Sequence, residues 1–276
     1  MHILVVNDDG PPSSVSPYVG HLVDALQARD HLVSVILPHT QRSWIGKAHL
    51  INETITCTES REPGQEGWII ANSSPAGCIQ LGTHHFFKER GPIDLIVSGP
   101  NYGQNITALY AMSSGTLGGA LEGALSGYRA IAISFDKPLG VTTDALVATA
   151  RQGVKIIEAL VEKWHPNSSV ELYSINMPIA DDISKRKVVW TTIFGNRWNN
   201  HGAFVEVGER LPSSQDDQTT SRTFRWGPRL DGADGFKAAV DGEDVWAIAQ
   251  GYISITPLTA NFSTPTNALQ ADPLVL

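Results

Sequence analysis

The sequence predicts an α/β protein built on a doubly wound, mainly parallel sheet, with a smaller β-rich second part. Apolar strand-like segments alternate with helical segments four times in the first half of the chain, which is typical of a parallel sheet with crossover helices. The length of 276 residues suits one large domain with an elaboration. Beyond about residue 170 strands continue while helices become scarce, which indicates the β-rich part.

Four runs rich in Val and Ile, without polar alternation, predict strands buried on both faces. They cover residues 3–6, 32–37, 93–97 and 130–134. Apolar residues at helical spacing predict helices at residues 17–28, 76–87, 116–125 and 143–164. Ser14 or Ser16 is the expected N-cap of the first helix, with Pro17 in its first turn.

In the second half, residues 171–175, 187–192 and 251–256 predict further strands. Residues 211–221 offer little that could be buried, so we expect a mobile loop or the tip of an extension there.

Composition excludes several classes of protein. The formal net charge is −8, from 20 Lys and Arg against 28 Asp and Glu, which disfavours a duplex nucleic acid as partner. Cys57 and Cys78 lack CxxC spacing, so we expect neither a zinc–thiolate cage nor a disulfide scaffold, and we expect a reducing compartment, the cytoplasm. No apolar run is long enough for a membrane span, and the first six residues fit a strand better than a signal peptide.

The first predicted strand ends in Asp8 and Asp9. Adjacent carboxylates repel each other unless a cation lies beside them, so the pair is a candidate site for a hard divalent metal. The alternative is a polar strand-to-helix turn in which Gly10 supplies a positive φ. Because ligands bind at the carboxyl ends of strands in open α/β sheets, the other strand ends are the next places to search.

Two further segments carry suitable polar groups. Residues 98–105 contain Asn101 and Asn105, whose amide oxygens suit a hard cation, although a loop rich in Asx turns would use the same residues. Residues 113–120 are small and open a helix, so their free N–H groups and hydroxyls would suit a phosphate. The alternative there is close packing of the helix on the sheet through Gly118 and Gly119.

The loop after the second strand carries Arg42, Ser43 and Trp44. Arg42 could meet an anion. Trp44 could stack on a base, but covering the core is the interpretation we favour for it. His84 and His85 lack the context of a zinc site.

P-loop, dinucleotide-binding, α/β-hydrolase and kinase motifs are all missing from the sequence. Four strand-end loops rich in Asp, Asn, Ser, Thr and Gly remain. Together they favour metal-assisted hydrolysis of a phosphoryl group.

The chain resembles the SurE survival-protein family of metal-dependent nucleotidases and acid phosphatases. The resemblance rests on ordered motifs that extend from residue 1 to about residue 258. They are Asn7-Asp8-Asp9-Gly10, Ser43, Ser74-Pro75-Ala76-x-Cys78, Ser98-Gly99-Pro100-Asn101-x-Gly103-x-Asn105, Ser114-Gly115-Thr116-x-Gly118-x-Ala120-x-Glu122-Gly123, Asn176-x-Pro178 and residues 251–258.

This resemblance implies a Rossmann-like three-layer core that binds metal and phosphate, expected at residues 1–180. A β-rich extension and C-terminal segment, expected at residues 181–276, would complete the single domain and serve in assembling a homodimer or homotetramer. One divalent ion, Mg²⁺ or Mn²⁺, is implied. The expected ligands of this ion are Asp8, Asp9, Ser43 and Asn101. The expected catalytic residues are Asp8, Asp9 and Asn101. The expected phosphate contacts are Asn105, Ser114, Gly115 and Thr116.

Some positions depart from the family pattern. Ser74 stands where Thr is usual, and Gly77 replaces an Asp. A Gly supplies neither the charge nor the hydrogen bonds of an Asp, so a role of that Asp in shaping the site or the dimer does not carry over to this chain. Residues 11–14 and 44–48 resemble the eukaryotic, especially fungal, branch.

The predicted function is hydrolysis of nucleoside monophosphates and other phosphomonoesters, of the acid phosphatase type, with a small phosphorylated molecule as substrate. Asp8 is the expected general base, and direct attack by Asp8 is the alternative route. A nucleoside ribohydrolase would use similar carboxylates. A non-enzymatic phosphoacceptor module also has an acidic pair after its first strand, and Lys137-Pro138 imitates its Lys-Pro dipeptide. This chain, however, lacks the phosphoacceptor Asp at the end of a middle strand and is about twice as long as such a module needs to be.

Overall fold

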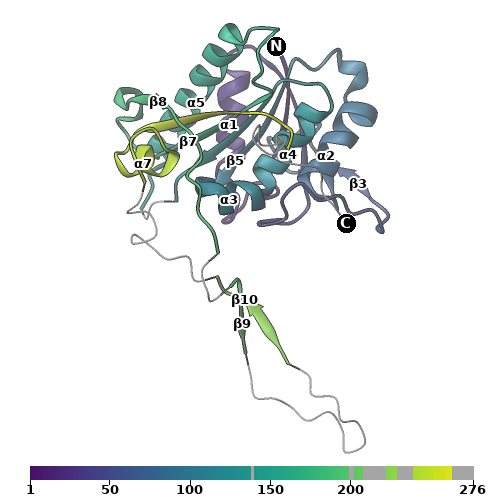
Figure 1. The fold of residues 1–276 in the computed structure, drawn as a ribbon. Coiled ribbons are helices and arrows are strands. Elements are labelled where there is room, and N and C mark those ends of the chain that lie inside the picture. Colours follow the sequence, from purple (N-terminus) through teal and green to yellow (C-terminus); the bar gives the residue numbers. More distant parts are fainter. Residues whose placement is uncertain (138–139, 199–201, 208–221, 229–238, 263–276) are drawn as a thin grey trace, which may run out of the picture.

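The computed structural model describes residues 1–137, 140–198, 202–207, 222–228 and 239–262. Within these ranges a nine-stranded sheet has the order β3-β4-β2-β1-β5-β6-β7-β11-β8, and helices cover both of its faces (Figure 1). The strands are β1 (His2–Val6), β2 (Leu32–Pro38), β3 (Cys57–Glu59), β4 (Ile69–Ala71), β5 (Leu95–Tyr102), β6 (Ala130–Phe135), β7 (Leu172–Met177), β8 (Val188–Trp190) and β11 (Ile253–Leu258).

The central strands, from β4 to β7 in the sheet order, all run parallel to one another. β3 is antiparallel to β4 at one edge, and β11 is antiparallel to β7 near the other. β8 pairs parallel with β11. The predicted mainly parallel α/β fold is therefore confirmed.

Helices α1 (Val19–Gln27) and α5 (Thr143–Lys163) pack together on one face of the sheet, and α2 (Pro75–Leu81) and α4 (Gly115–Leu125) pack together on the other. Within β1, Ile3 and Val5 belong to the apolar cluster on the α1 side, whereas Leu4 and Val6 belong to the cluster on the α2 side. Successive side chains of a strand point to opposite faces, so a strand between two helical layers must be apolar throughout.

The remaining helical segments of the described residues are short. They are a π-helical turn (Gly82–Phe86), 3₁₀ turns (Lys88–Arg90 and Ile183–Lys185), α3 (Thr107–Ser113) and α7 (Asp244–Ala249). No helix within the described ranges has the length and apolar character that crossing a membrane requires.

β9 (Phe204–Glu206) and β10 (Phe224–Trp226) form an antiparallel hairpin that projects away from the body (Figure 1). The loop expected at residues 211–221 lies outside the described residues. β8 and β11 belong to the same sheet as β1, so residues on both sides of position 180 share one sheet.

The ends of two expected elements were wrong. α1 begins at Val19 without a side-chain cap, because the hydroxyl of Ser16 donates instead to the carbonyl oxygen of Gly10 over 2.7 Å. β5 does not end at Val97 but continues to Tyr102, with a shift in its pairing to β6 between Ser98 and Asn101.

Candidate active site

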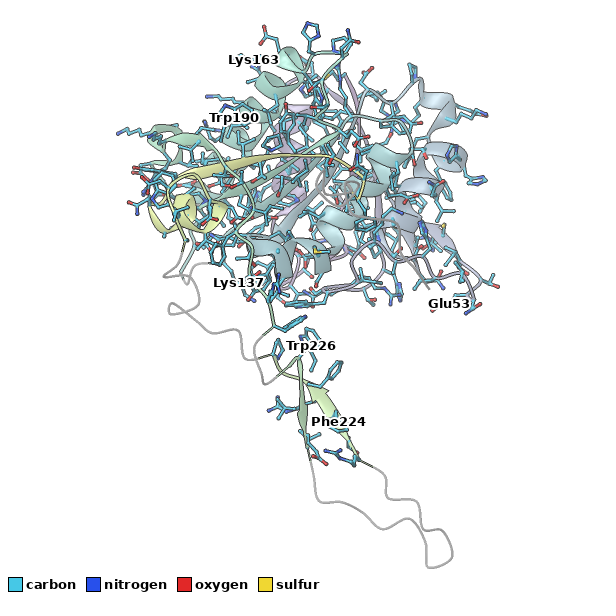
Figure 2. The ribbon with its side chains drawn as sticks, viewed as in Figure 1. Glu53, Lys137, Lys163, Trp190, Phe224 and Trp226 are labelled. Atoms are coloured by element: carbon cyan, nitrogen blue, oxygen red, sulfur yellow. The ribbon has the colours of Figure 1, made fainter. Side chains whose placement is uncertain are left out.

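A cavity of about 360 Å³ lies at the carboxyl ends of the parallel strands, where the loops after β1, β2 and β5 meet the start of α4. Figure 2 shows Lys137, which follows β6, at the end of the body from which the hairpin projects. The residues that line the cavity are Asp8, Ser43, Trp44, Asn101, Tyr102, Gly103, Gln104, Asn105, Ile106, Tyr110, Ser113 and Ser114.

The turn after β1 is fixed by its own polar groups. The amide nitrogen of the Asn7 side chain donates to the carbonyl oxygen of Gly10 over 2.9 Å, and the backbone N–H of Gly10 donates back to Asn7 Oδ1 over 2.9 Å. Gly10 has a φ of +85°, which a residue without a Cβ adopts at little cost. This closed turn holds Asp8 and Asp9 at the end of the strand.

Asp8 is buried against the start of α4. Its Oδ1 accepts a hydrogen bond of 2.6 Å from the hydroxyl of Thr116. Gly115 allows this approach, because a Cβ at that position would lie 2.6 Å from Asp8 Cβ. Burial raises the pKa of Asp8, the charge of Asp9 raises it further, and the Thr116 hydrogen bond lowers it, with a net pKa of about 7.

Asp9 is also buried, but it does not line the cavity. Its Oδ2 accepts a hydrogen bond of 2.6 Å from the backbone N–H of Tyr102, and its Oδ1 accepts one of 3.2 Å from the Gln41 side chain. Burial raises the pKa of Asp9, while these donors and the charge of Lys137 oppose the rise. Asp9 therefore joins the ends of β1 and β5 behind Asp8.

Asn101 and Ser43 supply neutral oxygens at the cavity. The amide nitrogen of Asn101 donates to the carbonyl oxygen of Gly103 over 2.6 Å, which leaves Oδ1 as the free end of that side chain. Ser43 is exposed and lines the cavity beside Asp8. The loop that carries Ser43 is joined to the first strand end by a hydrogen bond of 2.6 Å from the backbone N–H of Arg42 to the carbonyl oxygen of Asp8.

The donor chemistry of these residues fits a hard divalent cation. Carboxylate, hydroxyl and amide oxygens are the ligands that Mg²⁺ and Mn²⁺ prefer. Two adjacent buried carboxylates, Asp8 and Asp9, are costly without a compensating positive charge. In the described part of the chain no cluster of three or more His, Cys, Asp or Glu forms an alternative metal site.

The residues expected to contact phosphate divide into two groups. Asn105 and Ser114 line the cavity, whereas Gly115 and Thr116 lie behind Asp8. The side-chain amide of Asn105 donates to Ser134 Oγ over 2.9 Å. Ser114 Oγ caps α4 by accepting a hydrogen bond of 3.1 Å from the backbone N–H of Leu117. The structure thus brings five of the expected residues to the cavity and leaves three, Asp9, Gly115 and Thr116, outside its lining. The five are Asp8, Ser43, Asn101, Asn105 and Ser114.

The interpretation of Trp44 as a core residue was wrong. Trp44 is half-buried and lines the cavity, with a left-handed φ of +64°. The ring centroid of Trp44 lies 5.3 Å from that of Tyr110. Tyr110 belongs to α3, a helix that the sequence did not predict. Arg42 does not line the cavity.

Sequence reasoning also missed Asp244. This buried carboxylate accepts hydrogen bonds of 2.8 Å from the backbone N–H of Thr107 and 2.9 Å from that of Phe194. It thereby fixes the start of α3, which carries Tyr110. No spacing in the sequence connects residue 244 with residue 107.

Two departures from the family pattern, Ser74 and Gly77, lie at the N-cap and in the first turn of α2. Ser74 caps this helix by accepting a hydrogen bond of 3.1 Å from the backbone N–H of Gly77, as a Thr hydroxyl would. A Cβ at Gly77 would lie 2.2 Å from Ser73 Oγ. Neither residue lines the cavity.

Comparison with known proteins identifies the class that this fold and site define. The family model described as survival protein SurE matches residues 3–200. The chain therefore belongs to the SurE family, as the sequence motifs predicted.

Individual relatives agree with this assignment. A protein named 5'-nucleotidase SurE from Ruegeria pomeroyi is 32% identical, over 98% of this chain and 98% of its own length. A protein from Saccharomyces cerevisiae named probable tubulin–tyrosine ligase PBY1 is 30% identical over 95% of this chain, which spans only 41% of that protein. The crystal structure of the SurE protein from Aquifex aeolicus matches with a TM-score of 0.72 over 95% of each chain at 23% identity, which shows the shared fold.

Proposed function

We propose that this protein is a phosphoric monoester hydrolase that releases phosphate from nucleoside monophosphates and other phosphomonoesters with the help of one Mg²⁺ or Mn²⁺ ion. The observation that carries the proposal is the oxygen-lined cavity, in which buried Asp8 lies beside Ser43, Asn101 and Ser114. Relatives named 5'-nucleotidase SurE support the reaction class.

Asp8, Asp9, Ser43 and Asn101 would hold the metal. When bound, a divalent ion supplies positive charge to the phosphoryl oxygens and makes a bound water more acidic. Residues of the chain orient the phosphate and accept the proton. Asn105 and Ser114 orient the phosphate, and the Thr116 hydroxyl fixes one oxygen of Asp8 so that the other can accept the proton of the attacking water.

Two rival functions predict different products. A nucleoside ribohydrolase would release free base, and a phosphoacceptor module would retain phosphate without turnover. Release of inorganic phosphate with multiple turnovers contradicts both.

Assembly and location belong to the same proposal. We place residues 1–180 in the catalytic core and assign residues 181–276 to a β-rich extension that assembles a homodimer or homotetramer. Sedimentation velocity measures that state directly. We place the protein in the cytoplasm, which is consistent with Cys57 and Cys78 being free.

The test is a phosphate-release assay on 5'- and 3'-nucleoside monophosphates, p-nitrophenyl phosphate and glycerol 2-phosphate, from acid to neutral pH. We expect release with Mg²⁺ or Mn²⁺ and its loss with EDTA. A rapid burst of one equivalent of product per site would indicate attack by Asp8 itself. No release from any substrate by folded, metal-supplemented protein would refute the proposed function.

A further inference from the structure

Five of the residues that line the cavity lie within the short stretch 105–114. They are Asn105, Ile106, Tyr110, Ser113 and Ser114. α3 occupies the middle of this stretch, between the expected phosphate contacts Asn105 and Ser114. The place of α3 therefore determines where both contacts lie.

α3 begins with a residue in a strained backbone conformation. Thr107 is fully buried and has a φ of +69°, which is rare for a residue with a branched Cβ. Such a conformation persists only where the surrounding groups fix it. The buried carboxylate of Asp244 supplies this constraint, because its Oδ2 accepts a hydrogen bond of 2.8 Å from the backbone N–H of Thr107.

The next two backbone donors of α3 also find their acceptors outside the helix. The N–H of Ala108 donates to the carbonyl oxygen of Phe194 over 2.9 Å, and the N–H of Leu109 donates to Asn196 Oδ1 over 2.9 Å. The first N–H groups of a helix have no partner within the helix, so the second half of the chain completes the first turn of α3. Figure 1 shows this connection, where the chain passes from β8 beside α3 toward β9.

Asp244 is itself fixed by the backbone around it. Its Oδ1 accepts hydrogen bonds of 2.9 Å from the N–H of Phe194 and 2.8 Å from the N–H of Val245. Its own backbone N–H donates to the carbonyl oxygen of Thr192 over 2.9 Å. Both carboxylate oxygens thus accept from backbone donors, and the side chain does not line the cavity. Asp244 can therefore act on a substrate only through α3.

We propose that Asp244 and Asn196 are positioning residues for phosphate hydrolysis. By fixing the first turn of α3, they hold the phosphate contacts Asn105 and Ser114 in place without touching the substrate. This inference rests on the proposed function. The expected metal ligands lie on other segments, at the ends of β1 and β5 and in the loop after β2. The two positioning residues should therefore govern phosphate binding and leave metal binding unchanged.

Asn196 provides the first test, because its side chain is only half-buried and its replacement should not prevent folding. N196A removes the acceptor of the Leu109 N–H, whereas N196D keeps an oxygen that can accept from it. Binding is measured by calorimetric titration with inorganic phosphate in the presence of Mg²⁺. We expect N196A to bind phosphate about three- to tenfold more weakly than the wild type, and N196D to stay within about twofold. An equal loss in both variants would show that the hydrogen bond to α3 has no such role.

D244N provides the second test. The variant keeps the shape of the side chain but replaces one of its two accepting oxygens by an amide nitrogen, which cannot accept from a backbone N–H. Misplacement of a contact by about 1 Å can cost about a hundredfold in rate. We expect phosphate binding to weaken about tenfold or more, and kcat/KM for p-nitrophenyl phosphate to fall at least as much. Titration with Mn²⁺ alone should give an affinity within about twofold of the wild type.

D94N is the matched control for the loss of a carboxylate that accepts a backbone N–H. Asp94 Oδ2 accepts a hydrogen bond of 2.7 Å from the N–H of His2. It does so where β1 and β5 begin, at the end of these strands opposite to the cavity. We expect D94N to bind phosphate and to turn over substrate like the wild type.

The outcomes separate the positioning role from the proposed function. Unchanged phosphate binding and turnover in N196A and in folded D244N would overturn the positioning role and leave the phosphatase intact. An equal loss of Mn²⁺ and phosphate affinity would overturn it as well, because it would indicate damage to the whole site. Phosphate binding that depends on both residues, in a protein that releases phosphate from no substrate, would instead refute the phosphatase and retain the positioning role. If D244N fails to fold, the comparison of N196A with N196D decides.

Discussion

Replacing Thr116 by valine removes one hydroxyl from beside Asp8 and nearly preserves the shape of the side chain. That hydroxyl donates to Asp8 Oδ1 over 2.6 Å, and Thr116 is fully buried. A hydrogen bond to a charged group contributes about 1.5–3 kcal/mol, which at about 1.4 kcal/mol per pKa unit equals about one to two units. In the metal-free protein, T116V should therefore raise the pKa of Asp8 from about 7 to about 8–9.

The consequence is a loss of metal affinity that depends on pH. A metal binds the ionised carboxylate, so protonation of Asp8 competes with it. At about pH 6.5 the ionised fraction of Asp8 should fall about 8- to 80-fold in T116V, whereas at about pH 9 the fall should be about twofold or less. The apparent affinity for Mn²⁺ should weaken by the same factors.

Calorimetric titration with Mn²⁺ at the two pH values measures this difference. T116S keeps the hydroxyl and should bind Mn²⁺ like the wild type. Equal weakening of T116V at both pH values would show that Thr116 acts through shape rather than through the pKa of Asp8. Unchanged binding at the lower pH would refute the reasoning altogether.

Three further changes test the site and its support. D8N should reduce turnover by at least about a hundredfold while the protein stays folded, as circular dichroism would record; near-wild-type turnover with added metal would exclude the assigned role of Asp8. In G115A the new Cβ would lie 2.6 Å from Asp8 Cβ, so turnover should fall more than about tenfold, whereas G195A, where a Cβ meets no atom within 4 Å, should leave it unchanged. Burial alone would raise the pKa of Glu122, but Lys47 and the other hydrogen-bonding and charged partners of Glu122 outweigh burial and lower the pKa of Glu122 below 4.5. E122Q should therefore lower the melting temperature at neutral pH, and the difference in melting temperature between E122Q and the wild type should disappear as the pH falls below 4.5. A difference in melting temperature that does not change with pH would contradict this reasoning.

The layered core could be predicted because its strands are apolar on both faces. The strands expected at residues 3–6 and 130–134 correspond to β1 and β6, which are buried along their whole lengths. β3 and β4 could not be predicted, because three residues each are too few to show periodicity. α3 was not predicted, because its seven residues follow directly on residues 98–105, whose Asn and Gly residues indicated a loop.

The sequence predicted where the candidate site lies better than it predicted what each residue does there. The rule that ligands bind at strand ends predicted Asp8 and Asn101 as site residues, and the family resemblance added Ser43. The roles of these residues stay predictions that the variants above test. The position of Trp44 could not be predicted, because an αL conformation at a tryptophan leaves no trace in hydrophobic spacing. Asp244 could not be predicted either, because its contacts join segments distant in the chain.

The insertion of β11 between β7 and β8 has a consequence for synthesis of the chain. Among the described strands, β8 pairs only with β11, although more than 60 residues separate Trp190 from Ile253. β8 therefore leaves the ribosome well before its partner exists, and its backbone donors must remain with water until β11 is made. Closing this long loop late costs entropy that the local βαβ units do not incur. Completion of this edge of the sheet should follow formation of the local βαβ units, so amide protons in β8 should gain protection later than those in β1.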